Sequence, residues 1–125
     1  MEKNGNLVPI ESDRDIPFRI ERIFYVYGIE DKETRGKHAH YDTKQLLICI
    51  NGSIDVICHD GINQKKWTLN KRNQALYIPE LIWDEQIYEK DSMLLVLSDT
   101  LYDKEDYIED FDEFLKIKKI NQCTY

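Results

Sequence analysis

The chain has 125 residues, of which 42% are hydrophobic, and this is enough for one domain with one core. A net charge of -7 and a pI near 4.9 argue against broad nucleic-acid contact, which depends on Lys and Arg neutralising phosphates. The sequence shows no signal-peptide pattern and no apolar run of membrane-spanning length, so we expect a cytoplasmic protein. The three cysteines include no CxxC pair and predict neither a disulfide framework nor a zinc knuckle.

The predicted elements from residue 22 to residue 99 are strands. Short runs rich in β-branched and aromatic residues lie at 22–28, 43–52, 53–61, 65–70, 74–89 and 92–99. Asn51 and Gly52 both tolerate positive φ, so this pair predicts a hairpin that joins strand 43–50 to strand 53–59. The pattern predicts an antiparallel all-β domain that closes into a sandwich or barrel.

The C-terminal part of the chain has a different period. Apolar residues recur with spacing i, i+1, i+4, i+7 and i+8, and they are Tyr107, Ile108, Phe111, Phe114 and Leu115. This stripe predicts an amphipathic helix over 103–118, with Asp103 as its N-cap.

The main candidates for catalysis or metal binding are His38 and His40. Residues at i and i+2 on a strand project to the same face, so both imidazoles can enter one cavity. Histidine titrates near neutral pH and therefore suits acid–base catalysis, but it is also a common metal ligand. The pair alone leaves metal binding, acid–base chemistry and a surface coincidence open.

Spacing around the pair resembles the cupin motifs. Gly36, His38, His40, Gln45 and Gly52 are spaced as in the first motif, in which two His and a Glu bind a metal. Asp84, five residues after Pro79, stands where the second motif carries its third His. Gln is a weak ligand, so metal binding is disfavoured. His38, His40 and Asp84 still leave a metal-dependent cupin enzyme as an alternative.

A narrower resemblance covers nearly the whole chain. The segments RGKHAHYDTKQLLICINGSIDV, ALYIPELIW and LYDKEDYIEDFDEF resemble the sugar 3,4-ketoisomerase family, which acts on dTDP-4-keto-6-deoxyglucose. The resemblance implies a single all-β cupin domain over 1–125, an RmlC-like jelly-roll barrel with a short C-terminal helix. It also implies that no metal or other cofactor is needed, and that a homodimer exchanges the N-terminal strands within 1–20. The family usually has a His after the Trp of the second motif, whereas here Asp84 follows Trp83.

Moving a ketone from C4 to C3 requires removal of the C3 proton, an enediol, and protonation at C4, without net oxidation. We assign His40 as the base and His38 as its partner. The resemblance adds Tyr27 and Arg35 as groups that stabilise the enediolate. Residues expected to bind substrate are Gln45, Tyr25, Trp83, Arg19 and Asp84. The pyrophosphate needs guanidinium groups, and the available ones are Arg14, Arg19, Arg22, Arg35 and Arg72.

Two further functions remain open at this point. A non-catalytic cupin would bind a sugar nucleotide without proton exchange. An epimerase of the same pathways would use a His–Asp pair and a distant Tyr, which the HAH run fits poorly.

Overall fold

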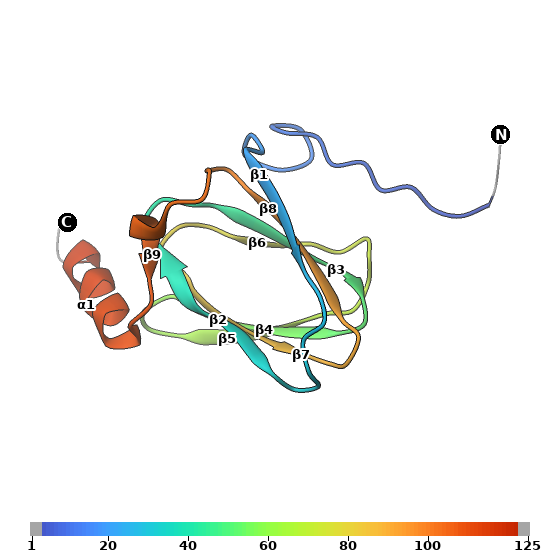
Figure 1. Cartoon of the computed structure of the whole chain (residues 1–125). Coiled ribbons are helices and arrows are strands. Elements are labelled where there is room, and N and C mark those ends of the chain that lie inside the picture. Colours follow the sequence, from blue (N-terminus) through green and yellow to red (C-terminus); the bar gives the residue numbers. More distant parts are fainter. Residues whose placement is uncertain (1–3, 123–125) are drawn as a thin grey trace.

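The computed structural model describes residues 4–122, and it consists mainly of two antiparallel sheets that face each other (Figure 1). One sheet has the order β1 (Arg22–Val26), β8 (Met93–Ser98), β3 (Gln45–Asn51) and β6 (Leu76–Ile78). The other has the order β5 (Gln64–Leu69), β4 (Ile54–His59), β7 (Trp83–Tyr88), β2 (Thr34–His40) and β9 (Tyr107–Ile108). The predicted all-β fold is therefore confirmed, and its form is the double-sheet jelly roll.

The turn at Asn51 and Gly52 does not close a hairpin. It leads from β3 in one sheet directly to β4 in the other, and the two strands pair with other neighbours. Gly52 has φ +83°, as predicted, and a Cβ atom there would lie 2.3 Å from Oγ of Ser92. The predicted turn is correct, but the predicted hairpin pairing is wrong, because burial on facing sheets decides the strand partners.

The run 74–89, predicted as one segment, contains two strands. β6 belongs to one sheet and β7 to the other, and Leu81, with φ 58°, lies in the turn between them. β2 contains a bulge between Gly36 and His38, where the backbone φ of Gly36 is +84°. A Cβ at Gly36 would lie 3.1 Å from the carbonyl oxygen of Asp84, so the bulge brings β2 close against β7.

The core lies between the two sheets. Its fully or nearly fully buried members are Leu47, Cys49, Ile54, Val56, Leu69, Ile78, Tyr88, Leu94 and Val96. A second cluster forms on the outer face of the four-stranded sheet, where Ile16 and Phe18 pack on Leu46, Ile48 and Leu97. Ile10 also packs against this cluster, and the chain that precedes it is extended (Figure 1).

The predicted helix over 103–118 is wrong in its start. α1 spans Phe111–Gln122, and it is preceded by a 3₁₀ turn at Lys104–Asp106 and by β9. Asp103 accepts a hydrogen bond from the Glu105 amide and so caps the 3₁₀ turn. Asp110 accepts from the amides of Asp112 and Glu113, and it is the residue that caps α1.

The reason for the shorter helix is tertiary pairing. Tyr107 and Ile108, which fit the helical stripe, instead pair with His40 and Ala39 of β2. Phe114 of α1 packs in a third cluster with Ala39, Trp83 and Ile108. Among the described residues no helix is long and apolar enough to cross a membrane.

Candidate active site

A cavity of about 280 Å³ lies between the two sheets, and both sheets contribute to its wall. Apolar side chains from the four-stranded sheet line one side, and they are Phe24, Val26, Leu94 and Val96. Polar residues provide most of the remaining lining, and they are Arg35, His38, Gln45, Gln86, Tyr107 and Glu109. The cavity therefore joins an apolar wall to a cluster of groups that can move protons and bind a polar ligand.

His38 and His40 lie on the same face of β2, as predicted. Their ring centroids are 5.0 Å apart in a T-shaped arrangement. His38 lines the cavity, whereas His40 lies behind it with only 4% of its surface exposed. The ring of Tyr107 is 4.5 Å from the His40 ring and 5.1 Å from the His38 ring, so the three rings form one cluster.

His40 is held in the neutral form. Burial lowers its pKa to about 4, and the neighbouring His38 acts in the same direction, while a hydrogen bond and the charge of Asp106 oppose the shift. Nδ1 of His40 lies 3.0 Å from Oδ2 of Asp106. Nε2 of His40 is buried and has no hydrogen-bond partner among the described residues. A neutral, desolvated imidazole with an unused nitrogen has the properties of a general base.

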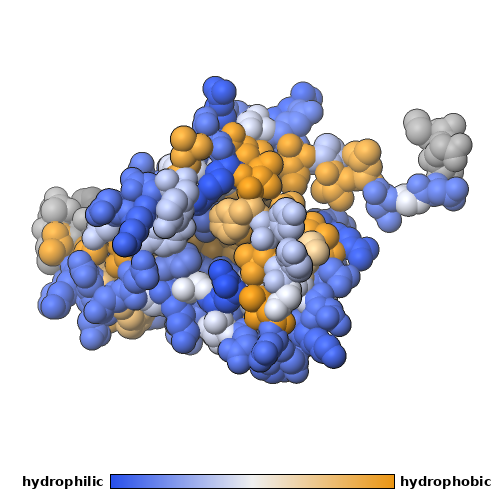
Figure 2. Space-filling view, viewed as in Figure 1, coloured by the Kyte–Doolittle hydropathy of each residue, from blue (hydrophilic) through white to orange (hydrophobic). Residues whose placement is uncertain are grey.

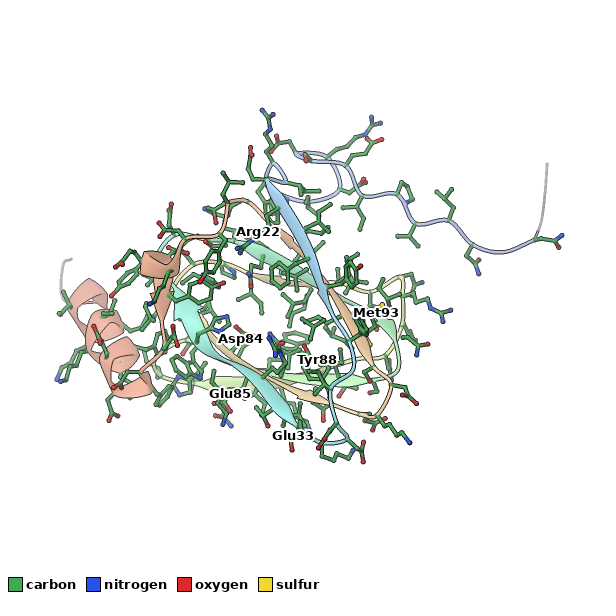
Figure 3. All side chains as sticks on the ribbon, viewed as in Figure 1. Arg22, Glu33, Asp84, Glu85, Tyr88 and Met93 are labelled. Carbon is green, nitrogen blue, oxygen red and sulfur yellow. The ribbon has the colours of Figure 1, made fainter. Side chains whose placement is uncertain are left out.

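Asp84 is fully buried on β7, opposite His38, and Figure 3 shows it between the two sheets together with Tyr88. Its Oδ1 lies 4.0 Å from Nε2 of His38, and its Oδ2 accepts a 2.8 Å hydrogen bond from Nε2 of Gln86. The Tyr88 hydroxyl donates to Oε1 of Gln86 at 2.8 Å. Burial raises the pKa of Asp84, and attraction to His38 and the Gln86 bond oppose this change. The hydrogen bonds from Tyr88 to Gln86 and from Gln86 to Asp84 therefore hold the Asp84 carboxyl group close to His38.

Two of the other predicted residues belong to the cavity. Arg35, from β2, and the buried Gln45, from β3, both line it. The guanidinium and the amide supply hydrogen-bond donors on two sides of the space next to His38.

The structure does not bring the predicted tyrosines to the site. Tyr25 and Tyr27 are 62% and 67% exposed, and their rings lie 6.0 Å apart on the outer face of the sheet. Alternation along β1 directs Phe24 and Val26 toward the cavity instead. The sequence placed Tyr25 and Tyr27 on a common face correctly, but that face is the outer one.

Trp83 and Arg19 also lie away from the cavity. Trp83 is buried against Phe111 and Phe114 of α1, and its indole N–H donates to Glu85 at 3.2 Å. It therefore contributes to the core beneath the helix and is not free to stack on a base. Arg19 is exposed on the surface and pairs with Glu21 at 3.4 Å.

Four residues that lie in or beside the site were not predicted from the sequence: Asp106, Tyr107, Gln86 and Glu109. Three of them fall at or beside the part of the predicted helix that is not helical. A second potential cap, Asp110, immediately before Phe111, was the available signal for the later helix start.

Among the predicted guanidiniums, Arg22 stands over the rings of Phe24 and Tyr102, and its buried Nε has no partner among residues 4–122.

Comparison with known proteins finds matches over nearly the whole chain. The profile described as FdtA: WxcM-like, C-terminal, matches residues 1–119. A TDP-4-oxo-6-deoxy-alpha-D-glucose-3,4-oxoisomerase of Aneurinibacillus thermoaerophilus is 39% identical over 123 residues, which are 97% of this chain and 88% of the relative.

Solved structures agree with the sequence match. The 3,4-ketoisomerase QdtA of Thermoanaerobacterium thermosaccharolyticum, as a His-to-Asn mutant in complex with TDP-4-keto-6-deoxyglucose, is 35% identical with a TM-score of 0.93, covering 98% of this chain and 90% of that one. The TDP-fucose-3,4-ketoisomerase WlaRA of Campylobacter jejuni is 36% identical with a TM-score of 0.91, covering 100% and 92%. The chain therefore belongs to the WxcM-like family of sugar 3,4-ketoisomerases.

Proposed function

We propose that the protein converts TDP-4-keto-6-deoxyglucose into its 3-keto isomer by proton transfer through an enediol. The observation that carries this proposal is the pair of imidazoles 5.0 Å apart, with His38 at the wall of the cavity and His40 held neutral behind it. A relative named for this activity is 39% identical over 97% of the chain. The same conversion needs no electron donor, because oxidation at C3 balances reduction at C4.

The reaction proceeds in two proton transfers at carbon. Nε2 of His40 removes the proton from C3, and the C4 oxygen gains a proton, which gives the enediol. The C3 hydroxyl then loses its proton to become the ketone, and C4 receives a proton. His38, which faces the cavity, carries protons to the oxygens and to C4.

Access to His40 requires a movement of Tyr107. The His40 ring is almost fully buried, and the Tyr107 ring lies 4.5 Å from it at the cavity wall. This arrangement keeps Nε2 of His40 desolvated until the substrate is bound.

Arg35 and Gln45 bind the reacting oxygens. The Arg35 guanidinium faces the cavity beside His38 and stabilises negative charge on the enediolate. The Gln45 amide binds a sugar hydroxyl from the opposite sheet. Arg22 is the guanidinium that we assign to the diphosphate, because its buried Nε is unpaired among the described residues, whereas Arg14 and Arg19 pair with Glu11 and Glu21 on the surface.

Incubation with TDP-4-keto-6-deoxyglucose in deuterated water tests this function. We expect loss of the C3 proton and formation of a 3-keto product. A non-catalytic sugar-nucleotide-binding protein would be stabilised by the ligand and would leave the C3 proton in place. The His40–Asp106 contact also fits the His–Asp pair of an epimerase, but an epimerase would return deuterium to C3 and retain the ketone at C4.

Turnover should survive metal chelation. A metal-dependent cupin enzyme would need His38, His40 and Asp84 to meet at one ion, but the Asp84 carboxyl group is hydrogen-bonded to Gln86. Within residues 4–122 no three His, Cys, Asp or Glu side chains are placed to hold an ion. We expect the same rate before and after dialysis against EDTA. Loss of turnover that a divalent ion restores would instead establish the metal-dependent enzyme.

The protein should form a homodimer in which the N-terminal segments are exchanged. Hydrophobic residues are exposed on the face shown in Figure 2 and along the N-terminal segment. Exposed hydrophobic residues include Leu7 and Val8 of this segment and Ile23 of β1. β1 is the outermost strand of its sheet, so its edge is available to a strand from a second copy. The exchanged segment is expected within residues 1–20, of which 1–3 lie outside the described residues.

Light scattering checks the dimer. The expected mass is twice the 15.0 kDa of one chain. Light scattering that gives the mass of a single chain at working concentration would contradict the proposal, and the exposed residues of β1 would then need another explanation.

A further inference from the structure

Asp106 makes contacts that no part of the chemistry above uses. Its Oδ2 lies 3.0 Å from Nδ1 of His40 and accepts a hydrogen bond from the Thr43 hydroxyl. Its Oδ1 accepts from the amide of Asp42 at 2.8 Å. The Thr43 hydroxyl in turn lies 2.7 Å from the hydroxyl of Thr100. Both carboxylate oxygens of Asp106 are thus hydrogen-bonded at the end of the strand that carries His40, although the two residues are 66 positions apart in the chain.

These contacts determine where the proton of His40 lies. An amide N–H can only donate, and the Thr43 hydroxyl is the donor in its bond to Asp106, so the carboxylate acts as an acceptor in both. Nδ1 of His40 must then supply the hydrogen in the third bond. A neutral imidazole carries a single ring proton, and His40 is neutral because burial lowers its pKa to about 4. The lone pair is therefore on Nε2.

The backbone holds Asp106 in this position. Its carbonyl accepts a 2.9 Å hydrogen bond from the Tyr41 amide, and the next residue, Tyr107, pairs with His40 in the β2–β9 ladder. Asp103, three residues earlier, caps the 3₁₀ turn that ends at Asp106. The turn and the two-residue strand together place the carboxylate at the edge of the imidazole on the side of Nδ1.

We propose that Asp106 is a positioning residue that sets the tautomer of His40 and keeps Nε2 available as a proton acceptor. The catalytic consequence rests on the proposed ketoisomerase function, whereas the tautomer itself does not. When Nε2 takes a proton from carbon, the imidazolium that forms already donates through Nδ1 to a carboxylate. The carboxylate therefore compensates the buried positive charge as soon as it forms. A buried His without Asp106 would have no such counter-charge.

Replacement of Asp106 by Asn separates this role from a structural one. The Asn carbonyl oxygen can still accept from the Asp42 amide, which leaves the NH₂ group facing Nδ1 of His40. An NH₂ group donates, so Nδ1 becomes the acceptor and the ring proton moves to Nε2. We expect turnover to fall by about 10²- to 10⁴-fold with little change in KM, because the base is present in the wrong tautomer.

Nitrogen NMR of ¹⁵N-histidine-labelled protein reads the tautomer directly. The chain has three histidines, and His59 supplies an internal reference, because its Nδ1 accepts a 3.0 Å hydrogen bond from the Gly61 amide. His59 is therefore expected as the Nε2–H tautomer and His40 as the Nδ1–H tautomer in the parent protein. In Asp106→Asn, the signals of His40 should change to the pattern of His59. Glu105→Gln is the matched control, since it removes an exposed carboxylate from the same turn without touching His40 or the Asp103 cap, and it should change neither the spectrum nor turnover.

The possible outcomes test the positioning role of Asp106 separately from the proposed function. An Nε2–H tautomer of His40 in the parent protein overturns the proposal, and this measurement requires no variant to fold. A folded Asp106→Asn variant that keeps the Nδ1–H tautomer also overturns it, whatever its activity. If the tautomer changes as expected but the parent protein leaves TDP-4-keto-6-deoxyglucose unchanged, the positioning role stands and the proposed function falls.

Discussion

Replacement of His40 by Asn should lower turnover by roughly 100-fold or more and should abolish exchange of the C3 proton. Asn keeps much of the shape and hydrogen-bonding capacity of the ring, but it has no group that titrates near neutral pH. The measurement is proton NMR of TDP-4-keto-6-deoxyglucose in deuterated water, which reports exchange at C3 separately from formation of the 3-keto product. Binding of TDP should change little, because His40 is buried behind the cavity wall.

His38→Asn is the matched variant, and it should give a different result. His38 lines the cavity and is assigned to the oxygens and C4, so its loss slows product formation. Removal of the C3 proton by His40 remains possible, and exchange with solvent should therefore continue without product. The two variants thus differ in exchange, while both lose turnover.

The outcomes of this pair distinguish the chemistry from the order of the residues. Interchanged results would keep the mechanism and make His38, the more accessible ring, the base at C3. Turnover like that of the parent protein in both variants would end the assignment of the histidines. Asp84 would then be the group to consider, because it is fully buried, its pKa is raised, and it lies 4.0 Å from His38.

The histidine pair was predictable from sequence because strand geometry is local. Alternation with period two places His38 and His40 on one face, and the bulge in β2 lies just before His38, so it does not disturb their relation. Most of the strands were predictable for the same reason, since β-branched residues mark each of the six predicted runs, whereas β2 and β9 lie outside those runs. Gly52 was predictable as a turn residue from its chemistry alone.

The partners of these residues were not predictable, because they depend on tertiary structure. The period of β1 shows that Tyr25 and Tyr27 share a face, but only the packed sheets decide that this face is the outer one. Asp106 meets His40 across 66 residues of chain, and no local pattern encodes that contact. Its segment follows a helical stripe yet pairs with β2, because burial of Ile108 beside Ala39 outweighs the local preference.

Replacement of Phe114 by Ala should destabilise the protein by about 3–5 kcal/mol. Phe114 is fully buried and packs in one cluster with Ala39, Trp83 and Ile108. Removal of the ring leaves a cavity between the helix and the five-stranded sheet, and the aromatic contacts with Trp83 and His59 are lost. Urea denaturation followed by tryptophan fluorescence measures the change in the free energy of unfolding.

Ile120→Ala on the same helix is the control, because Ile120 is 64% exposed and its loss should change stability by less than about 0.5 kcal/mol. Phe114 also supports the candidate site, since Ala39 lies between His38 and His40 in the chain and Ile108 follows Tyr107. Hydrogen exchange at the Tyr41 amide, which donates to the carbonyl of Asp106, should therefore become faster in Phe114→Ala. A variant with faster exchange at α1 but unchanged exchange at Tyr41 would show that the helix does not support the turn that carries Asp106.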